Sequence, residues 1–165
     1  MESYFFIPGT KLHKIQNIQN LDVDEIIIDL EDAVKVSERK QILEKLIVTN
    51  EFKNFYVRIP LYTTNESLDT SFFVELYNNG FRKFVFPKIQ QSQDFKVIIS
   101  EHSYEDLQII LLVESTRFFL EVQDVLLAYS YVFSGIGLGS HDFIAEVGGV
   151  HDLRNLEYIT LKVEG

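Results

Sequence analysis

The feature that most constrains the fold is an alternation of short apolar runs with longer amphipathic stretches. Six largely apolar runs lie at residues 4–7, 25–28, 55–57, 83–86, 111–113 and 132–138, and each ends in polar or turn residues. Between them, apolar residues recur at helical spacing. These faces comprise Leu12, Ile15 and Ile18; Ile42, Leu43, Leu46 and Ile47; Phe72, Phe73, Leu76 and Tyr77; Phe95, Ile98 and Ile99; and Phe118, Phe119, Val122 and Val125. Apolar strands alternating with amphipathic helices predict a parallel sheet covered by helices.

Composition supports one globular α/β domain spanning residues 1–165. Apolar residues make up 46% of the chain, and we find no low-complexity segment or linker. No apolar run reaches the ~18–20 residues that cross a bilayer. The chain has no cysteine, and its net charge of −10 argues against a general nucleic-acid surface. Because Met1-Glu2-Ser3 carries an acid where a signal peptide carries basic residues, we expect a cytoplasmic protein without a membrane segment.

Aromatic residues within the strand runs are expected to be core. Phe5, Phe6, Tyr56, Phe84 and Phe86 are among the aromatic side chains that fall there. Such side chains suit a packed β layer. We therefore expect these side chains to belong mostly to the core.

Two carboxylates follow strand ends near the C-terminal half of the chain. Glu114 follows the run at 111–113, and Asp142 lies just beyond the run at 132–138. The carboxyl ends of parallel strands share one edge of a sheet, so these acids can converge on a hard cation such as Mg²⁺. The alternative is that both are ordinary loop acids or helix caps. His141, beside Asp142, is a weaker candidate for a general base.

Other polar and turn residues follow the remaining runs. They are Pro8 and Gly9, then Asp29, Glu31 and Asp32, then Arg58, then Lys88. Their position places a site at the carboxyl ends of the strands, as in a TIM barrel or an open α/β sheet. Because the chain is acidic overall, an anionic substrate must meet local positive charge. Arg58, Lys88, Lys11 and a bound cation are the candidates.

These residues carry a resemblance to the citrate lyase β-subunit branch of the citrate lyase/2-oxo acid (4-hydroxy-2-oxoheptanedioate type) aldolase family. The matching pieces, in family order, are Phe6-Ile7-Pro8-Gly9, Ile28-Asp29-Leu30-Glu31-Asp32-Ala33-Val34, Val57-Arg58, Phe86-Pro87-Lys88, Val113-Glu114-Ser115 and Leu138-Gly139-Ser140-His141-Asp142-Phe143. Asp32 stands where the hydroxy-oxo acid aldolases usually have histidine, which favours the citrate lyase branch. The resemblance implies a TIM-type (β/α)8 barrel and Mg²⁺-dependent cleavage of carbon–carbon bonds.

The resemblance also implies roles for individual residues. Glu114 and Asp142 would hold the metal, and Arg58, Glu31 and Asp29 would serve catalysis. The implied substrate contacts are Arg58, Glu114, Gly139, Ser140, Lys88, Pro8 and Gly9. The loop Pro8-Gly9-Thr10-Lys11 resembles the segment that the family uses near a CoA thioester or its phosphates.

Several alternatives stay open for these residues. Arg58 has a second interpretation as a structural ion pair with Asp29 or Glu31. Lys88 has one as an ion pair across the strand ends. Gly139 either offers an N–H group to a substrate carboxylate or only permits a tight turn.

The chain also departs from the family pattern. Pro60 stands where the family commonly has Asn, and six strands are predicted where a closed barrel has eight. The first and sixth strands would be apolar edges, so we expect a homo-oligomer, or residues 153–163 packed over an edge.

Together these features predict a Mg²⁺-dependent carbon–carbon lyase that acts through a metal-stabilised enolate. Its substrate would be a short dicarboxylate, a 2-oxo acid or its CoA ester. The alternative is a catalytically impaired relative that serves as an acid-binding or protein-interaction module.

Overall fold

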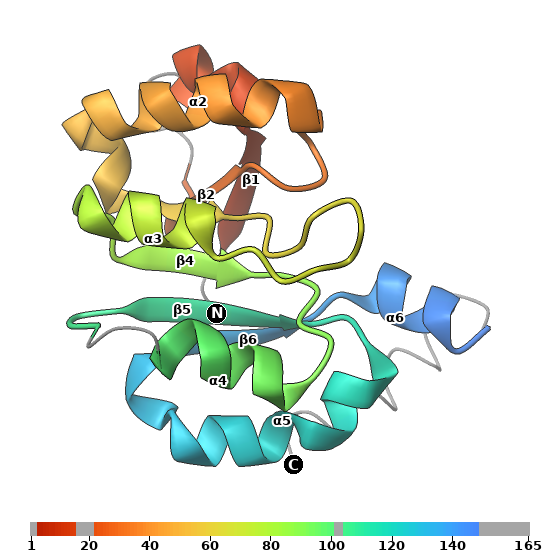
Figure 1. The fold of residues 1–165 in the computed structure, drawn as a ribbon. Helices are drawn as coiled ribbons and strands as arrows, with labels where there is room; N and C mark the ends of the chain where they lie inside the picture. The colour runs from red at the N-terminus through yellow and green to blue at the C-terminus, as the bar shows by residue number, and fades with distance from the viewer. Residues whose placement is uncertain (1–2, 16–21, 101–103, 149–165) are drawn as a thin grey trace. The chain divides into compact units, whose positions relative to one another are not determined.

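The structure is a computed structural model that describes residues 3–15, 22–100 and 104–148. It forms two compact units (Figure 1). The first comprises Met1–Phe86 with Asp106–Gln108, and the second comprises Pro87–Glu105 with Ile109–Gly165. Each unit contains parallel strands followed by helices, as the sequence predicts.

Four parallel strands form the sheet of the first unit. They are β1 (Tyr4–Pro8), β2 (Glu25–Asp29), β3 (Tyr56–Arg58) and β4 (Lys83–Phe86), and their order in the sheet is their order in the chain. The register aligns Pro8 with Asp29, Asp29 with Arg58, and Arg58 with Val85. Side chains that lie in register on parallel strands project to the same face. The carboxyl ends of β1, β2 and β3 therefore bring their terminal residues into one row.

Helices of the first unit pack through the faces that the sequence predicts. The elements are η1 (Gly9–Lys14), α2 (Val36–Val48), η2 (Asn50–Asn54) and α3 (Ser71–Asn78). On α3, the buried ring of Phe73 meets Phe84 and Phe86 of β4 edge-on, with centroids 5.0 and 5.2 Å away. On α2, Ile42, Leu43 and Leu46 are buried. The chain leaves α3 through Asn79 and Gly80, and Gly80 has a left-handed φ of 91°, a conformation that is common for glycine just after a helix end.

The first helical stretch differs from the expectation of an amphipathic α-helix. Gly9–Lys14 is a 3-10 segment, and Lys11 has non-helical φ and ψ of −112° and 21°. Ile15 is buried as predicted, whereas Ile18 lies outside the described residues.

The second unit contains a parallel strand pair with two helices on one side of it and a third helix beyond the strand ends (Figure 1). Its elements are β5 (Gln108–Val113), β6 (Phe133–Leu138), α4 (Ser92–Ser100), α5 (Thr116–Ala128), η3 (Ser130–Val132) and α6 (Ser140–Glu146). The ring of Phe95 on α4 lies 5.2 Å from Phe133 of β6 and 5.5 Å from Tyr129 at the end of α5. This aromatic cluster fixes α4 against both the strand and the neighbouring helix.

The aromatic prediction holds for two strands and fails for β1. Tyr56, Phe84 and Phe86 are buried, but Phe5 and Phe6 are 38% and 44% exposed. The reason is position, because β1 pairs with β2 on one side and has no second strand beside it among the described residues. Residues 153–163, expected to cover an edge, lie outside the described residues, and oligomerisation stays a prediction.

None of the helices in the described part of the chain is long and apolar enough to cross a membrane. The expectation of a single domain over residues 1–165 also stays a prediction.

Candidate functional site

An ion pair at the ends of β2 and β3 is the centre of the first cluster. Arg58 donates from Nε to Asp29 Oδ1 at 2.9 Å and from Nη2 to Asp29 Oδ2 at 2.7 Å. Both side chains are largely buried, with 14% and 4% of their surfaces exposed. The shared register of the two strands places them together. The ion pair that the sequence left open as an alternative is therefore present.

Two more carboxylates surround the same guanidinium. Nη1 of Arg58 lies 3.7 Å from Glu31 Oε2 and 3.6 Å from Asp32 Oδ2. The Phe6 ring covers the guanidinium at 5.2 Å. Burial alone would lower the pKa of Arg58, but the hydrogen bond and charge of Asp29, with the charges of the other two acids, raise it above its ordinary value. Arg58 is a permanent cation whose Nη1 edge faces polar groups.

Asp29 also organises the turn that carries the other two acids. Its Oδ1 accepts from the Glu31 N–H at 2.9 Å, and its Oδ2 accepts from the Ala33 N–H at 3.2 Å. Further along, Arg39 Nη2 on α2 donates to the Glu31 carbonyl at 2.8 Å. Asp29 therefore orients both the guanidinium and the turn, which is a supporting role.

Gly9 makes a close approach in this unit. A Cβ on Gly9 would lie 2.7 Å from Leu30 Cδ2 and 2.9 Å from Ile42 Cγ2. The absence of a side chain lets the β1–η1 turn pack against the end of β2 and against α2. Pro8, the other predicted substrate contact here, closes β1 in register with Asp29.

Glu114 is the centre of the second cluster, which lies in the second unit. It directly follows β5, as predicted, and is only 8% exposed. Its Oε2 accepts from the backbone N–H of Lys88 at 2.7 Å. Lys88 adopts φ of 55°, which is unusual for a residue with a side chain.

Gly139 gives room to the same glutamate. A Cβ built there would overlap Glu114 Cγ and Oε1 and would lie 2.7 Å from its Cδ. The Gly139 N–H donates to the Val113 carbonyl at 2.9 Å, so it is engaged within the protein. With φ of −79°, Gly139 needs no glycine-specific backbone conformation. Glycine is required here because a side chain would occupy the space of Glu114. From the sequence, a substrate-binding N–H and a tight turn were the two interpretations.

Asp142 lies in the first turn of α6, with Ser140 at the first position of that helix. Its Oδ2 is 3.8 Å from Lys88 Nζ, with 52% of its side chain exposed. At the other end of α6, Glu146 accepts from the Thr116 N–H at 2.8 Å and from its hydroxyl at 2.9 Å. This double hydrogen bond fastens the helix that carries Asp142 to the start of α5. His141 is exposed.

The second cluster has the donor chemistry of a hard-cation site. Glu114 and Asp142 both contact Lys88, and both present carboxylate oxygens. Mg²⁺ commonly takes one or two carboxylates and keeps water or substrate oxygens as its other ligands. No group of three or more His, Asp, Glu or Cys residues suited to a metal occurs within residues 3–15, 22–100 and 104–148. Glu114 and Asp142 are the residues of this cluster that could hold Mg²⁺, with water or substrate oxygens as its other ligands.

The pattern of a model for HpcH/HpaI aldolase/citrate lyase matches residues 2–160. The chain belongs to this family. It is 26% identical over 153 residues to a (3S)-malyl-CoA thioesterase of Cereibacter sphaeroides, covering 88% of this chain and 51% of that protein. The chain thus spans about half the length of the curated relatives it matches.

Solved structures of the family share the fold. RipC from Yersinia pestis matches with a TM-score of 0.74 and 22% identity, over 98% of this chain and 68% of that one. The citrate lyase β subunit of Mycobacterium tuberculosis, complexed with oxaloacetate and magnesium, matches with a TM-score of 0.74 and 18% identity, over 97% and 70%. The same protein with magnesium, acetoacetate and coenzyme A matches with a TM-score of 0.75 and 17% identity, over 98% and 60%. The described residues of this chain hold six parallel strands with helices between them, four strands in the first unit and two in the second, as the predicted α/β barrel class requires of its first six strands.

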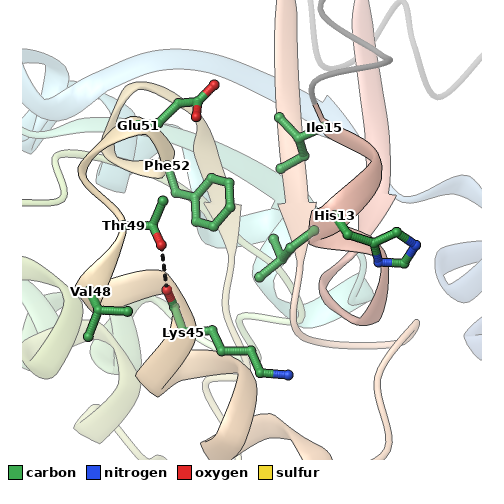
Figure 2. A pocket seen from close by; sticks show the side chains of 8 residues that line it. His13, Ile15, Lys45, Val48, Thr49, Glu51 and Phe52 are labelled. Carbon is green, nitrogen blue, oxygen red and sulfur yellow. Dashed lines mark hydrogen bonds between the residues drawn. The ribbon is translucent and has the colours of Figure 1, made fainter.

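A cavity of about 490 Å³ in the first unit is lined by none of the predicted site residues (Figure 2). Its lining comes from η1, the end of α2 and η2, with Ile15 and Phe52 on opposite walls. Within it, the Thr49 hydroxyl donates to the Lys45 carbonyl at 3.1 Å. A smaller cavity of about 270 Å³ shares His13 and Lys45 with it and includes Gly9. Of the predicted substrate contacts, Gly9 therefore lines this smaller cavity.

Three interactions that position the second cluster were not identified from the sequence. Ser115 Oγ caps α5 by accepting from the Phe118 N–H and donates to the Ile89 carbonyl, each at 3.1 Å. A serine three residues before an apolar helical face is a recognisable N-cap signal. The other two are the hydrogen bonds of Glu146 with Thr116 and of the Lys88 N–H with Glu114. They join residues far apart in the sequence, so no local sequence pattern predicts them.

Proposed function

We propose that the protein is a Mg²⁺-dependent carbon–carbon lyase acting on a short dicarboxylate, a 2-oxo acid or its CoA ester. The observation that carries the proposal is Glu114, a buried carboxylate with a fixed orientation, paired through Lys88 with Asp142. A carboxylate that the fold already holds in one orientation can present its oxygens to a hard cation with little further loss of side-chain freedom. When bound, Mg²⁺ polarises a carbonyl oxygen and stabilises an enolate.

Arg58 supplies the second part of the proposal. Asp29 holds the Nε and Nη2 side of the guanidinium, and Nη1, beside Glu31 and Asp32, is the edge that we propose meets a substrate carboxylate. A pre-oriented guanidinium binds a carboxylate with little loss of side-chain freedom. Glu31, 3.7 Å from Nη1, is placed to contact water or substrate beside that edge.

Among these substrates we favour the CoA ester. A thioesterase for (3S)-malyl-CoA is similar to this chain, and a family structure holds coenzyme A with magnesium. These two proteins are described with short acids, as a CoA thioester in the first case and together with coenzyme A in the second. We propose that the first loop, with Pro8 and Gly9, contacts the CoA portion. Cytoplasmic location and homo-oligomerisation belong to the same proposal.

The test is Glu114→Gln with calorimetric titration of Mg²⁺. The substitution keeps size and a hydrogen-bond acceptor while removing the charge, so the fold should survive and Mg²⁺ binding should be lost. The matched control is Asp124→Asn, an exposed acid on α5 whose loss should leave the affinity unchanged. If Glu114→Gln binds Mg²⁺ as the parent does, the metal site is elsewhere and the proposal fails.

A second candidate is an acid-binding or protein-interaction module. The observation in its favour is the apolar edge of β1, where Tyr4, Phe5 and Phe6 are 38%, 38% and 44% exposed. Such edges favour association with another chain. A chain that binds oxaloacetate or pyruvate but cleaves none of the hydroxy acids or their CoA esters offered in a lyase assay would select this candidate.

A further inference from the structure

We propose that Lys88 is a positioning residue that sets the cation affinity of Glu114 and Asp142 in two opposing ways. Its main chain holds Glu114 in the binding orientation, and its ammonium group occupies the side of Asp142 as a built-in competitor. The inference rests on the proposed metal site.

The main-chain half of the inference begins with backbone conformation. Lys88 has φ of 55°, in the left-handed region that side chains disfavour. Residues kept in that region cluster at functional sites, where the surrounding structure imposes the conformation. Here the conformation accompanies a hydrogen bond of 2.7 Å from the Lys88 N–H to Glu114 Oε2.

The neighbours of Lys88 fix this arrangement on both sides. Pro87, which precedes it, and Ile89, which follows it, are buried. The Ile89 carbonyl accepts from Ser115 Oγ at 3.1 Å, which ties the loop to the residue after Glu114. The N–H of Lys88 is therefore a fixed donor, and it selects one orientation of the glutamate.

The side-chain half concerns charge. Lys88 Nζ lies 3.8 Å from Asp142 Oδ2, with 39% and 52% of the two side chains exposed. A divalent cation that approaches Asp142 meets this ammonium and must repel it or displace it. The same residue thus favours the cation through its N–H group and opposes it through its side chain.

If Lys88 were only a structural residue, every substitution that harms the loop would change the Mg²⁺ affinity in the same direction. Because it has two opposing roles, some substitutions should raise the affinity and others should lower it. Lys88→Gly keeps the N–H and accepts a positive φ, but removes the ammonium. Lys88→Asn does the same, because asparagine tolerates the left-handed region. Lys88→Val removes the ammonium and also disfavours the backbone conformation.

The experiment is calorimetric titration of Mg²⁺, repeated with Mn²⁺ as a paramagnetic probe, on the full chain and these variants. We expect Lys88→Gly and Lys88→Asn to bind about three- to fivefold more tightly, the factor that loss of one half-exposed ion pair carries. We expect Lys88→Val to bind at least tenfold more weakly. Lys88→Arg, which keeps the charge, should stay within about twofold of the parent.

Two results would overturn the inference. One is weaker binding in Lys88→Gly and Lys88→Asn, which would make the ammonium a helper of the cation. The other is equal affinity in Lys88→Val and Lys88→Gly, which would remove the role of the main chain. If the parent binds no Mg²⁺ at all, the proposed function fails by itself. Urea unfolding still tests the main-chain half in that case, because Lys88→Val must be less stable than Lys88→Gly.

Discussion

Gly139→Ala is the sharpest test of how the second cluster is built. The new methyl group would overlap Glu114 Cγ and Oε1 and lie 2.7 Å from Cδ. Gly139 itself is held by its N–H bond to the Val113 carbonyl. The overlap must therefore be relieved by moving the Glu114 side chain, which is only 8% exposed.

The magnitude follows from what that movement breaks. The 2.7 Å bond from the Lys88 N–H to Glu114 involves a charged acceptor, and bonds of this class contribute about 1.5–3 kcal/mol. Crowding a packed site adds roughly 1 kcal/mol or more. We expect Gly139→Ala to lower the free energy of unfolding by about 2.5–4 kcal/mol, the sum of these two effects. It should also abolish measurable Mg²⁺ binding.

A matched control lies on the preceding strand. At Gly135 a new Cβ would be 3.6 Å from Ile110 Cγ1, an ordinary contact. Gly135→Ala should therefore be within about 0.5 kcal/mol of the parent or more stable, because alanine restricts the unfolded chain. Urea unfolding gives both free energies, and calorimetry gives Mg²⁺ affinity.

A double-mutant cycle with Glu114→Ala decides the cause. If the cost of Gly139→Ala comes from the glutamate, it should fall below about 1 kcal/mol once that side chain is truncated. A cost that persists in the Glu114→Ala background would refute the reasoning, as would a Gly139→Ala protein as stable as Gly135→Ala.

Two further predictions concern single charged groups. Arg58→Lys should weaken oxaloacetate or pyruvate binding roughly 10- to 100-fold in calorimetry, because one ammonium cannot replace the fork that grips Asp29 and leaves an edge for substrate; equal affinity would make Arg58 a structural residue only. At Glu121, the backbone N–H of Ser92 holds the carboxyl pKa below its ordinary value, so its stabilising effect is present above that value and is lost as the pH falls through the lowered one. The stability gap between the parent and Glu121→Gln, measured by urea unfolding, should shrink between neutral pH and about pH 3, and a constant gap would contradict this.

The sequence predicts those features of the molecule that depend on residues close together in the chain. Strand ends are visible because apolar runs stop, and parallel pairing then brings those ends to one edge. This is why Asp29 and Arg58 were placed together, and why Glu114 was placed directly after a strand. The N-cap at Ser115 had a readable signal too, although it was overlooked.

The parts that the sequence does not predict depend on contacts between distant residues. Gly139 and Glu114 are brought into van der Waals contact by the pairing of β5 with β6. Glu146 reaches Thr116 only because α6 returns to the start of α5. The length of β1 was predictable, but the exposure of Phe5 and Phe6 was not, because exposure depends on what lies beside the strand.

Charge gives an independent argument that a cation takes part. Around Arg58, one guanidinium faces three carboxylates, which leaves two negative charges in excess. Around Lys88, the ammonium group lies 3.8 Å from Asp142 and the backbone N–H donates to Glu114, so two carboxylates accompany one cationic side chain and one negative charge is in excess. The whole chain carries −10, so no surrounding positive field compensates. An anionic acid approaching such groups is repelled unless a cation is bound first. The affinity for oxaloacetate should therefore rise with Mg²⁺ concentration, as ordered binding of metal before acid requires.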